Sequence, residues 1–282
     1  MKMRRLKKWI AVWLALCSVA ALAAGCSEEA PPEEPTQPVT EPAPVDERTW
    51  AQRTIETFAE ISGVDPSVYP ESLWTLLEAN PETAGYVLQY PFLHDEKPEI
   101  DLSGYDRKAG VPLFMQWDVR WGYKTYGSDM AAITACGPTC LSMVAYYFTG
   151  DQAMSPDKIM DFAVKEGYCV KGKGTAWALI GEGAEKLGLN SKELPLSEGV
   201  IRRELAKGNP VICVMGPGVF TTTGHFIVLT GYENGQFRVN DPNSLRRSQK
   251  LWSYSEFYDQ IRNLWAISAP TTAEGSDHGE GQ

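Results

Sequence analysis

ITACGPTCLSMVAYYFTG, residues 133–150, indicates the fold of this 282-residue chain more clearly than any other stretch. Its apolar side chains recur at the i, i+3, i+4, i+7 spacing of a helix. They are Leu141, Val144, Ala145 and Phe148. Pro138 suits the first turn of such a helix and Gly150 suits its end. We therefore predict an amphipathic helix over residues 137–149, with cysteines at positions 136 and 140 near its beginning.

The elements around this helix change character along the chain. Three further helices are expected at residues 155–167, 176–188 and 197–208, each closed by a glycine. The stretches VICVM, HFIVLTGY and QFRVND then read as strands separated by glycine turns. Helices followed by an antiparallel sheet predict an α+β fold rather than the alternation of a doubly wound one.

The ends of the chain suggest export from the cell. Residues 1–25 combine five Lys and Arg with an apolar run and small residues, as a bacterial signal peptide does. Leu22-Ala23-Ala24-Gly25-Cys26 resembles a lipobox, so we expect a lipid anchor at Cys26 that holds an extracytoplasmic protein on the cell membrane. The alternative is an ordinary signal cut near Ala24 with an incidental Cys26.

The rest of the chain divides by composition. Residues 26–47 contain six prolines and seven acids and are expected to form a disordered tether. Residues 48–110 carry three short helical patterns and are expected to form a small cap. Residues 111–270 hold every candidate catalytic group, and residues 271–282 are expected to be a disordered tail.

Charge and cysteine content exclude several classes of function. Removing residues 1–25 takes five positive charges and changes the net formal charge from −10 to −15, which disfavours nucleic acid as a partner. Beyond the signal and the anchor, the cysteines are at 136, 140, 169 and 213. No C-x-x-C pair indicates a structural zinc, and no cofactor or metal is expected. A disulfide between Cys169 and Cys213 stays possible from sequence alone.

Cysteine catalysis requires a thiolate, whereas a free thiol has a pKa of about 8.5. A helix start contributes only about 0.3–2 kcal/mol to holding an anion, so an adjacent imidazolium must supply most of the stabilisation. Cys136 lies at the helix start, whereas Cys140 lies one turn further on among apolar groups. We expect Cys136 to react and Cys140 to pack. The alternatives are a strained disulfide between the two and a pair of unreactive core cysteines.

The general base has few candidates because the chain has three histidines. His278 lies in the tail and His94 in a Pro-flanked loop, which leaves His225 at the start of the HFIVLTGY strand. A lone histidine there is often structural. Its combination with Cys136 and a following strand that ends in a carboxylate favours a catalytic role.

The residue that orients the imidazole depends on strand register. A two-residue Asn234-Gly235 turn would place Asn240 on the face of His225. A three-residue Glu233-Asn234-Gly235 loop would instead oppose residues 227 and 241 and bring Asp241 to that face. Because a full charge stabilises imidazolium better than an amide does, we favour Asp241. Gln116, in FMQWDVRW, is the candidate side-chain donor to the oxyanion, unless it only braces the fold.

These motifs in this order resemble the bacteriocin-processing (double-glycine) cysteine peptidases of the papain-like fold. The resemblance covers about residues 111–268, through QWDVRW, ACGPTC, GKGTAW, GHFIVLTGY and VNDPN. It implies Cys136 as nucleophile, His225 as general base and acid, Asp241 as orienting residue and Gln116 at the oxyanion. In papain-like enzymes the glutamine usually lies closer to the cysteine in sequence. Residues 122–134 must therefore fold away from the site here. Three residues of GKGTAW, Gly174, Thr175 and Trp177, are expected to line the substrate cleft; the alternative is that Trp177 is buried.

The expected function is a cell-surface thiol peptidase that hydrolyses peptide or protein substrates through a thioester. The same residues would serve a cell-wall amidase or transpeptidase, in which only the acceptor differs. A third possibility is a peptide-binding lipoprotein with a vestigial triad.

Overall fold

The computed structural model describes residues 46–270, so the predicted signal peptide, Cys26, most of the tether and the tail lie outside it. The chain divides into two units, residues 1–96 and 97–282. Within the described part, no helix is both long enough and apolar enough to span a bilayer.

The smaller unit consists of helices, as the sequence predicts. They are α2 (Trp50–Ser62), η2 (Pro66–Val68), α3 (Glu71–Ala79), η3 (Pro81–Thr83) and α4 (Ala84–Leu93). Thr49 caps α2 through a reciprocal pair of hydrogen bonds with Gln52, and Gly63 ends it with a left-handed φ of 68°. Phe58 and Phe92 meet edge to face, with ring centroids 6.4 Å apart, and close the core of this unit.

The larger unit begins with its helical half. Its elements are β1 (Thr125–Tyr126), β2 (Asp129–Met130), α5 (Ala131–Thr134), α6 (Cys136–Thr149), η4 (Gln152–Met154), α7 (Pro156–Lys165), β3 (Cys169–Val170), β4 (Gly174–Thr175), η5 (Trp177–Leu179) and α8 (Glu182–Lys186). The predicted helix over 137–149 is therefore α6, which ends at Gly150 as expected. The helix expected over 176–188 is wrong as a single element, because η5 and α8 are separate with Gly181 between them.

The second half is built around one antiparallel sheet. Its strands are β5 (Asn190–Glu193), β6 (Val211–Met215), β7 (His225–Glu233), β8 (Gln236–Asn240), β9 (Leu251–Trp252) and β10 (Ile261–Ser268). They run in the order β5-β10-β6-β7-β8-β9. Helices α9 (Glu198–Ala206) and α10 (Leu245–Gln249) and the short turns η6 (Tyr254–Glu256) and η7 (Tyr258–Gln260) lie between them in sequence. The predicted α+β order is confirmed.

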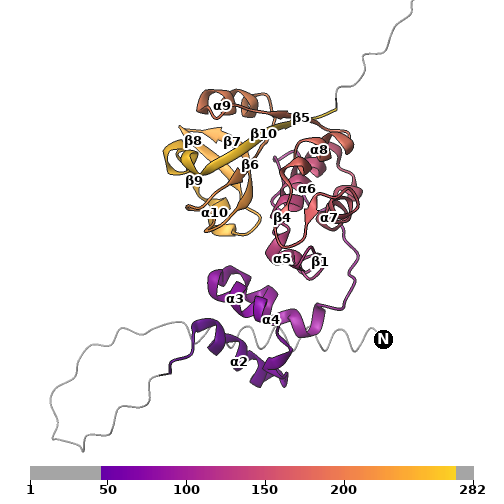
Figure 1. The fold of residues 1–282 in the computed structure, drawn as a ribbon, viewed down its shortest axis with the longest axis vertical. Coiled ribbons are helices and arrows are strands. Elements are labelled where there is room, and N and C mark those ends of the chain that lie inside the picture. The colour runs from indigo at the N-terminus through magenta and orange to yellow at the C-terminus, as the bar shows by residue number, and fades with distance from the viewer. Residues whose placement is uncertain (1–45, 271–282) are drawn as a thin grey trace, which may run out of the picture. The chain divides into compact units, whose positions relative to one another are not determined.

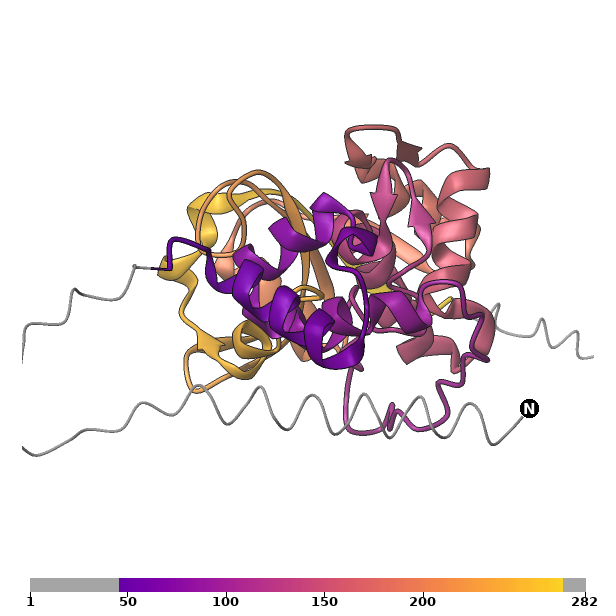
Figure 2. The ribbon, with the colours of Figure 1, turned by 90° about the horizontal axis from the view of Figure 1, so that it is seen from below.

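Two cores form on opposite faces of this sheet. In β6, Ile212 and Val214 join the core that contains α6 and α7, whereas Cys213 joins the core on the other face. This alternation follows from the two-residue period of a strand. Helix α6 packs against α7 and against β7, and the helical half and the sheet lie side by side in two perpendicular views (Figures 1 and 2).

The boundary between the units lies earlier than the sequence predicts. Residues 97–110 were expected in the cap, but they belong to the larger unit. Leu102 is buried in the core beside α6, its N–H donates to the side chain of Gln152, and its carbonyl accepts from Tyr146.

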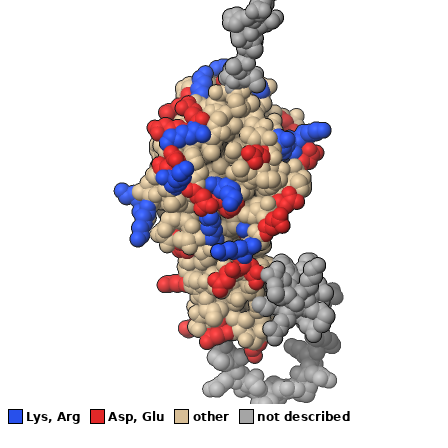
Figure 3. Space-filling view, turned by 90° about the vertical axis from the view of Figure 1, so that its right-hand side faces the viewer, with Lys and Arg blue, Asp and Glu red and all other residues tan. Residues whose placement is uncertain are grey.

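On the face shown in Figure 3, basic and acidic side chains are interspersed, in keeping with ion pairs such as Lys124–Asp161 and Lys186–Glu166.

Candidate active site

Cys136 is the first residue of α6, one position inside the helix rather than before it as expected. Its neighbour Gly137 makes this start possible, because a Cβ there would lie 2.9 Å from the side chain of Thr175 on β4. No side chain caps the first turn of α6. The unpaired N–H groups and the positive end of the helix are therefore available to an anion at Cys136.

The other three cysteines of the described region have thiols with raised pKa values. Cys140 and Cys213 are fully buried, and burial raises the pKa of both thiols above the ordinary value. Burial also raises the pKa of Cys169, which is partly exposed. All four thiols, including that of Cys136, are free, so neither a 136–140 nor a 169–213 disulfide is present. The prediction that Cys140 packs in the core is confirmed.

His225 opens β7 at the end of the sheet, opposite Met215 on β6. Its side chain is 7% exposed, and its Nε2 lies 2.8 Å from Oδ1 of Asp241. Asp241 therefore takes one ring nitrogen and leaves Nδ1 for a second partner. The thiol of Cys136 lies near the same imidazole and contributes to raising its pKa. The structure thus brings together the three residues that the sequence proposed as a triad.

The imidazole is strongly biased toward its charged form. Burial lowers the pKa of His225, but the charge of Asp241, its hydrogen bond with the ring and the nearby thiol of Cys136 outweigh burial and raise that pKa to about 10. The imidazolium is the partner that a catalytic thiolate requires.

The strand register that brings Asp241 to His225 arises differently from the prediction. The turn between β7 and β8 has two residues, Asn234 and Gly235, both with positive φ, so the three-residue loop is wrong. A bulge between Leu229 and Gly231 adds the missing residue, and Val228 therefore pairs with Asn240. Beyond the bulge the register is the one that the longer loop would have produced.

Asn240, the alternative orienting residue, has another function. Its side-chain amide donates to the carbonyls of Val111 and Pro112, both at 3.1 Å. It therefore ties β8 to the segment that leads to Gln116 rather than contacting His225. The preference for Asp241 over Asn240 agrees with this geometry.

Asp241 is a fully buried carboxylate with a partner on each side. Its Oδ1 accepts from His225 and from the backbone N–H of Asn243, both at 2.8 Å, and its Oδ2 accepts from Nε of Arg247 at 2.5 Å. Burial alone would raise the pKa of Asp241, but His225 and Arg247 lower it below the ordinary value. The carboxylate is therefore held in its charged form.

Gln116 is also buried, and the nineteen residues between it and Cys136 do fold away. They include the β1–β2 hairpin and α5, and Ala132 N–H donates to Gly122 to close this loop. The side-chain Nε2 of Gln116 donates to the Ala132 carbonyl at 2.7 Å, and its Oε1 is buried without a hydrogen-bond partner. An amide nitrogen has two hydrogens, and the bond to Ala132 uses one of them.

The predicted cleft residues lie beside the start of α6. Thr175 packs on Gly137, and its hydroxyl is 3.0 Å from that of Tyr126. Gly174 pairs with Val170 across the β3–β4 hairpin at a positive φ of 81°. Trp177 is 46% exposed, so the alternative of a buried tryptophan is wrong. Contact of these residues with substrate stays a prediction.

Sequence reasoning missed the segment that follows Asp241. Arg247 completes the carboxylate's partners, and Ser248 Oγ accepts the Asp241 N–H at 2.9 Å. The sequence could have indicated this partner, because a buried aspartate at the end of a strand needs a positive partner besides the histidine. LRRS, residues 245–248, offers such a charge but has the pattern of an ordinary polar helix.

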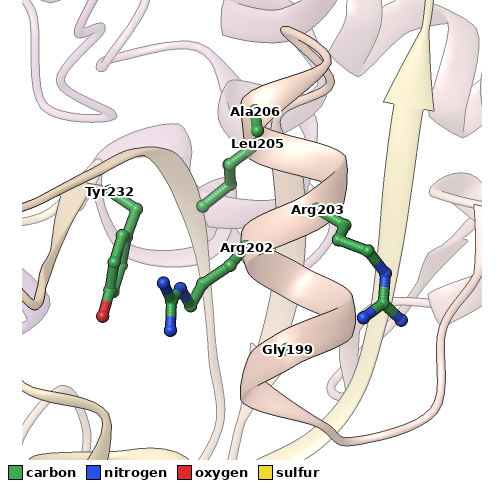
Figure 4. Close-up of a pocket in the computed structure, with 6 residues that line it drawn as sticks. All are labelled: Gly199, Arg202, Arg203, Leu205, Ala206 and Tyr232. Carbon is green, nitrogen blue, oxygen red and sulfur yellow. The ribbon is translucent and has the colours of Figure 1, made fainter.

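A surface groove of about 480 Å³ lies elsewhere, between α9 and β7 (Figure 4). Its lining residues are Gly199, Arg202, Arg203, Leu205, Ala206 and Tyr232. The guanidinium of Arg202 stacks 4.3 Å from the Tyr232 ring centroid. None of the predicted site residues lines this groove. Within residues 46–270, no three His, Cys, Asp or Glu side chains are grouped so as to hold a metal ion.

Comparison with known proteins identifies the family of this chain. The model of the peptidase C39-like family matches residues 108–271, more than half of the chain. The chain belongs to this family. It is accordingly a cysteine peptidase that acts on peptide or protein substrates, and the predicted papain-like fold is confirmed.

Two solved structures are similar to this C39-like peptidase. One is the peptidase domain of Streptococcus ComA, a bifunctional ABC transporter of a quorum-sensing pathway, with 22% identity and a TM-score of 0.40 over 56% of this chain and 98% of that one. The other is a C39-like peptidase from Bacillus anthracis, with 16% identity and a TM-score of 0.36 over 57% and 96% of the two chains. No curated protein sequence matches.

Proposed function

We propose that this C39-like peptidase uses a Cys136–His225–Asp241 triad, with Gln116 at the oxyanion. The observation that supports it most directly is the buried imidazole of His225, which hydrogen-bonds with Asp241 at 2.8 Å and lies near the thiol of Cys136. A positive ring between a sulfur and a carboxylate is the arrangement that stabilises a thiolate and can later release a proton.

The proposed reaction has two stages. The Cys136 thiolate attacks the peptide carbonyl carbon, and His225 then gives its Nδ1 proton to the leaving amine, so that the C–N bond breaks and a thioester remains. A water molecule next attacks the thioester carbonyl while His225 accepts one of its protons. The C–S bond breaks, the acid product leaves, and the thiolate and imidazolium are restored. Asp241 stays ionised throughout and holds Nε2.

The oxyanion formed in both stages needs hydrogen-bond donors. The backbone N–H of Cys136, in the uncapped first turn of α6, is one candidate. The Nε2 of Gln116 is the second, because the Ala132 carbonyl occupies only one of its two hydrogens. Substituting Gln116→Ala should lower kcat by about 10²- to 10³-fold, as loss of one oxyanion donor does.

A brief pulse of substoichiometric iodoacetamide at about pH 6 tests the ion pair without any substrate. We expect Cys136 to be alkylated ahead of Cys140, Cys169 and Cys213, because a free thiol is almost entirely protonated at that pH. The selectivity should disappear in His225→Ala. Equal labelling of the four thiols in the native protein would argue against the pair.

Cleavage of a peptide library by the full chain tests the activity itself. Products should be absent with Cys136→Ala and present with Cys140→Ala, the matched control for an unreactive cysteine. Cleavage that survives in Cys136→Ala would refute the assignment of the nucleophile. Adding a labelled amine separates hydrolysis from transpeptidation, because only a transpeptidase would join the label to the product.

We further propose that Cys26 carries a lipid that anchors the enzyme outside the cytoplasm. The support is the sequence LAAGC after a basic and apolar leader, followed by an acidic, proline-rich stretch. Cys26→Ser should release the protein from the membrane fraction, and metabolic labelling with a fatty acid should mark only the chain that keeps Cys26. Unchanged membrane association of Cys26→Ser would contradict the anchor.

A further inference from the structure

Asp241 has one carboxylate oxygen that the triad does not use. Oδ1 serves His225, whereas Oδ2 lies 2.5 Å from Nε of Arg247 and forms an ion pair with it. The carboxylate is 0% exposed, so no bulk water competes for either oxygen. A carboxylate bonded from opposite sides cannot rotate about its Cβ–Cγ bond without losing a partner.

Arg247 is itself held firmly in place. Its backbone N–H donates to the side chain of Ser244, which caps α10, and its carbonyl accepts from the indole N–H of Trp252 at 3.0 Å. The next residue, Ser248, accepts from the Asp241 N–H. The chain from 241 to 248 therefore folds back so that the side chains of Arg247 and Ser248 both return to Asp241.

The same segment reaches the oxyanion side of the site. The carbonyl of Pro242 accepts from the backbone N–H of Gln116 at 2.8 Å, and the carbonyl of Asn243 accepts from the indole of Trp117 at 3.2 Å. The position of Asp241 is thus coupled to that of Gln116 through two adjacent residues.

We propose that Arg247 is a positioning residue for the triad: its guanidinium holds Oδ2 of Asp241, so that Oδ1 stays directed at the imidazole of His225. This inference rests on the proposed triad and assigns a role to a residue outside it. The guanidinium of Arg247 is paired with Asp241, so it acts on the triad through that carboxylate.

Removing the positive charge of Arg247 should change the pKa of His225. The titratable or charged groups that interact with the carboxylate are His225 on β7, Arg247 on α10 and the thiol of Cys140 on α6, and the thiol of Cys136 interacts with His225. Arg247 neutralises part of the Asp241 charge. Without Arg247, the remaining negative charge would hold the imidazolium more strongly, so the pKa of His225 should rise further and that of Asp241 should rise toward its ordinary value.

Histidine nuclear magnetic resonance tests this inference on the full chain. The chain has three histidines, so [15N]histidine labelling gives few ring signals, and His225→Gln assigns one of them. In Arg247→Met we expect the titration midpoint of His225 to move up by roughly 0.5–1 unit. The downfield Nε2–H resonance, protected by Asp241, should broaden or vanish as the carboxylate becomes free to rotate.

Three variants separate charge from shape. Arg247→Lys keeps the charge without the flat guanidinium, so its midpoint should stay near the native value while the Nε2–H resonance weakens. Arg247→Gln removes the charge and keeps a donor, so its midpoint should rise. Arg246→Met removes the same charge from the adjacent, exposed position on α10 and should change neither signal.

The results that would overturn the role of Arg247 differ from those that would overturn the proposed triad. A native midpoint and a native Nε2–H signal in Arg247→Met overturn the positioning role, even when iodoacetamide still selects Cys136 and the triad stands. If iodoacetamide does not label Cys136 preferentially in the native protein, both the triad and this inference are overturned. If Arg247→Met does not fold, an unshifted midpoint in Arg247→Gln overturns the role instead.

Discussion

Asp241 is the residue on which the electrostatics of the site depend. It raises the pKa of His225 against the effect of burial, and it keeps its own pKa low through His225 and Arg247. Both effects support one arrangement, an imidazolium paired with the Asp241 carboxylate.

Replacing Asp241 by Asn tests the importance of that charge. The amide retains the shape but cannot hold an imidazolium, so the pKa of His225 should fall toward its ordinary value of about 6.5. The basic limb of the pH–rate profile should move down with it. We expect kcat/KM on a peptide from the library to fall by about 10²- to 10⁴-fold.

Asn240→Ala is the matched control, because Asn240 is the neighbouring residue on β8 and was the alternative orienting candidate. It should lose only the bonds to Val111 and Pro112 and lower the free energy of unfolding, with an unchanged pH–rate profile. A profile that moves equally in both variants would mean that the strand end, and not the carboxylate, sets the pH range.

At this scale the sequence predicts most of the reactive groups. Cys136 stands out at a helix start, and few histidines compete with His225. Arg247 could not be predicted, because its role depends on a reverse turn over 241–248 whose hydrogen bonds are made by serine side chains. Nothing in LRRS shows which arginine turns inward.

At the scale of elements, the pairing of β7 with β8 decides which side chain faces His225. Turn chemistry correctly favours Asn-Gly as a two-residue turn, and that turn alone would have brought Asn240 to the site. The bulge between Leu229 and Gly231 reverses this outcome. A bulge depends on packing across the sheet rather than on a local motif, so sequence predicts the residue but not the geometry that delivers it.

The contact of α6 with β4 offers a prediction about stability. A Cβ on Gly137 would lie 2.9 Å from Cβ and Cγ2 of Thr175, so Gly137→Ala must push the hairpin away. We expect it to lower the free energy of unfolding by about 1–3 kcal/mol, the usual range for overpacking. In a Thr175→Gly background the same substitution should be neutral, which a double-mutant cycle in urea would measure.

Gly199→Ala, on α9, is the control for that experiment. Its added Cβ would approach nothing closer than 3.6 Å, at the Arg203 guanidinium, so helix propensity should dominate and raise stability by up to about 1 kcal/mol. A Gly137→Ala protein as stable as the native one would show that the hairpin gives way without penalty, and that Thr175 is not fixed beside Cys136.

At the scale of the whole molecule, the sequence predicts a helical unit followed by an α+β unit but places their boundary too late. Residues 97–110 contain few apolar side chains, and one of these, Leu102, anchors the segment to the larger core. A single buried leucine gives no periodic signal, so only the structure shows that this arm belongs with the peptidase unit.

Buried charge should also make the stability of the molecule depend on pH. The pKa of His225 is about 10 in the folded chain and about 6.5 when unfolded, so its stabilising effect is complete below about pH 6.5 and is lost as pH rises through 10. The lowered pKa of Asp241 acts on the other side, because that stabilisation is lost as pH falls below about 4. The two residues together favour stability in weak acid.

The window from about pH 6.5 to 8 isolates the histidine. Above about pH 8.5 the buried thiols of Cys140 and Cys213 also destabilise the fold, because the unfolded chain releases their protons first. Urea unfolding across the window should show a fall of about 1–2 kcal/mol in the free energy of unfolding. His225→Gln should remove most of that slope. If the slope persists in His225→Gln, the pH dependence comes from other groups. The imidazolium of His225 would then not contribute to the stability of the peptidase unit.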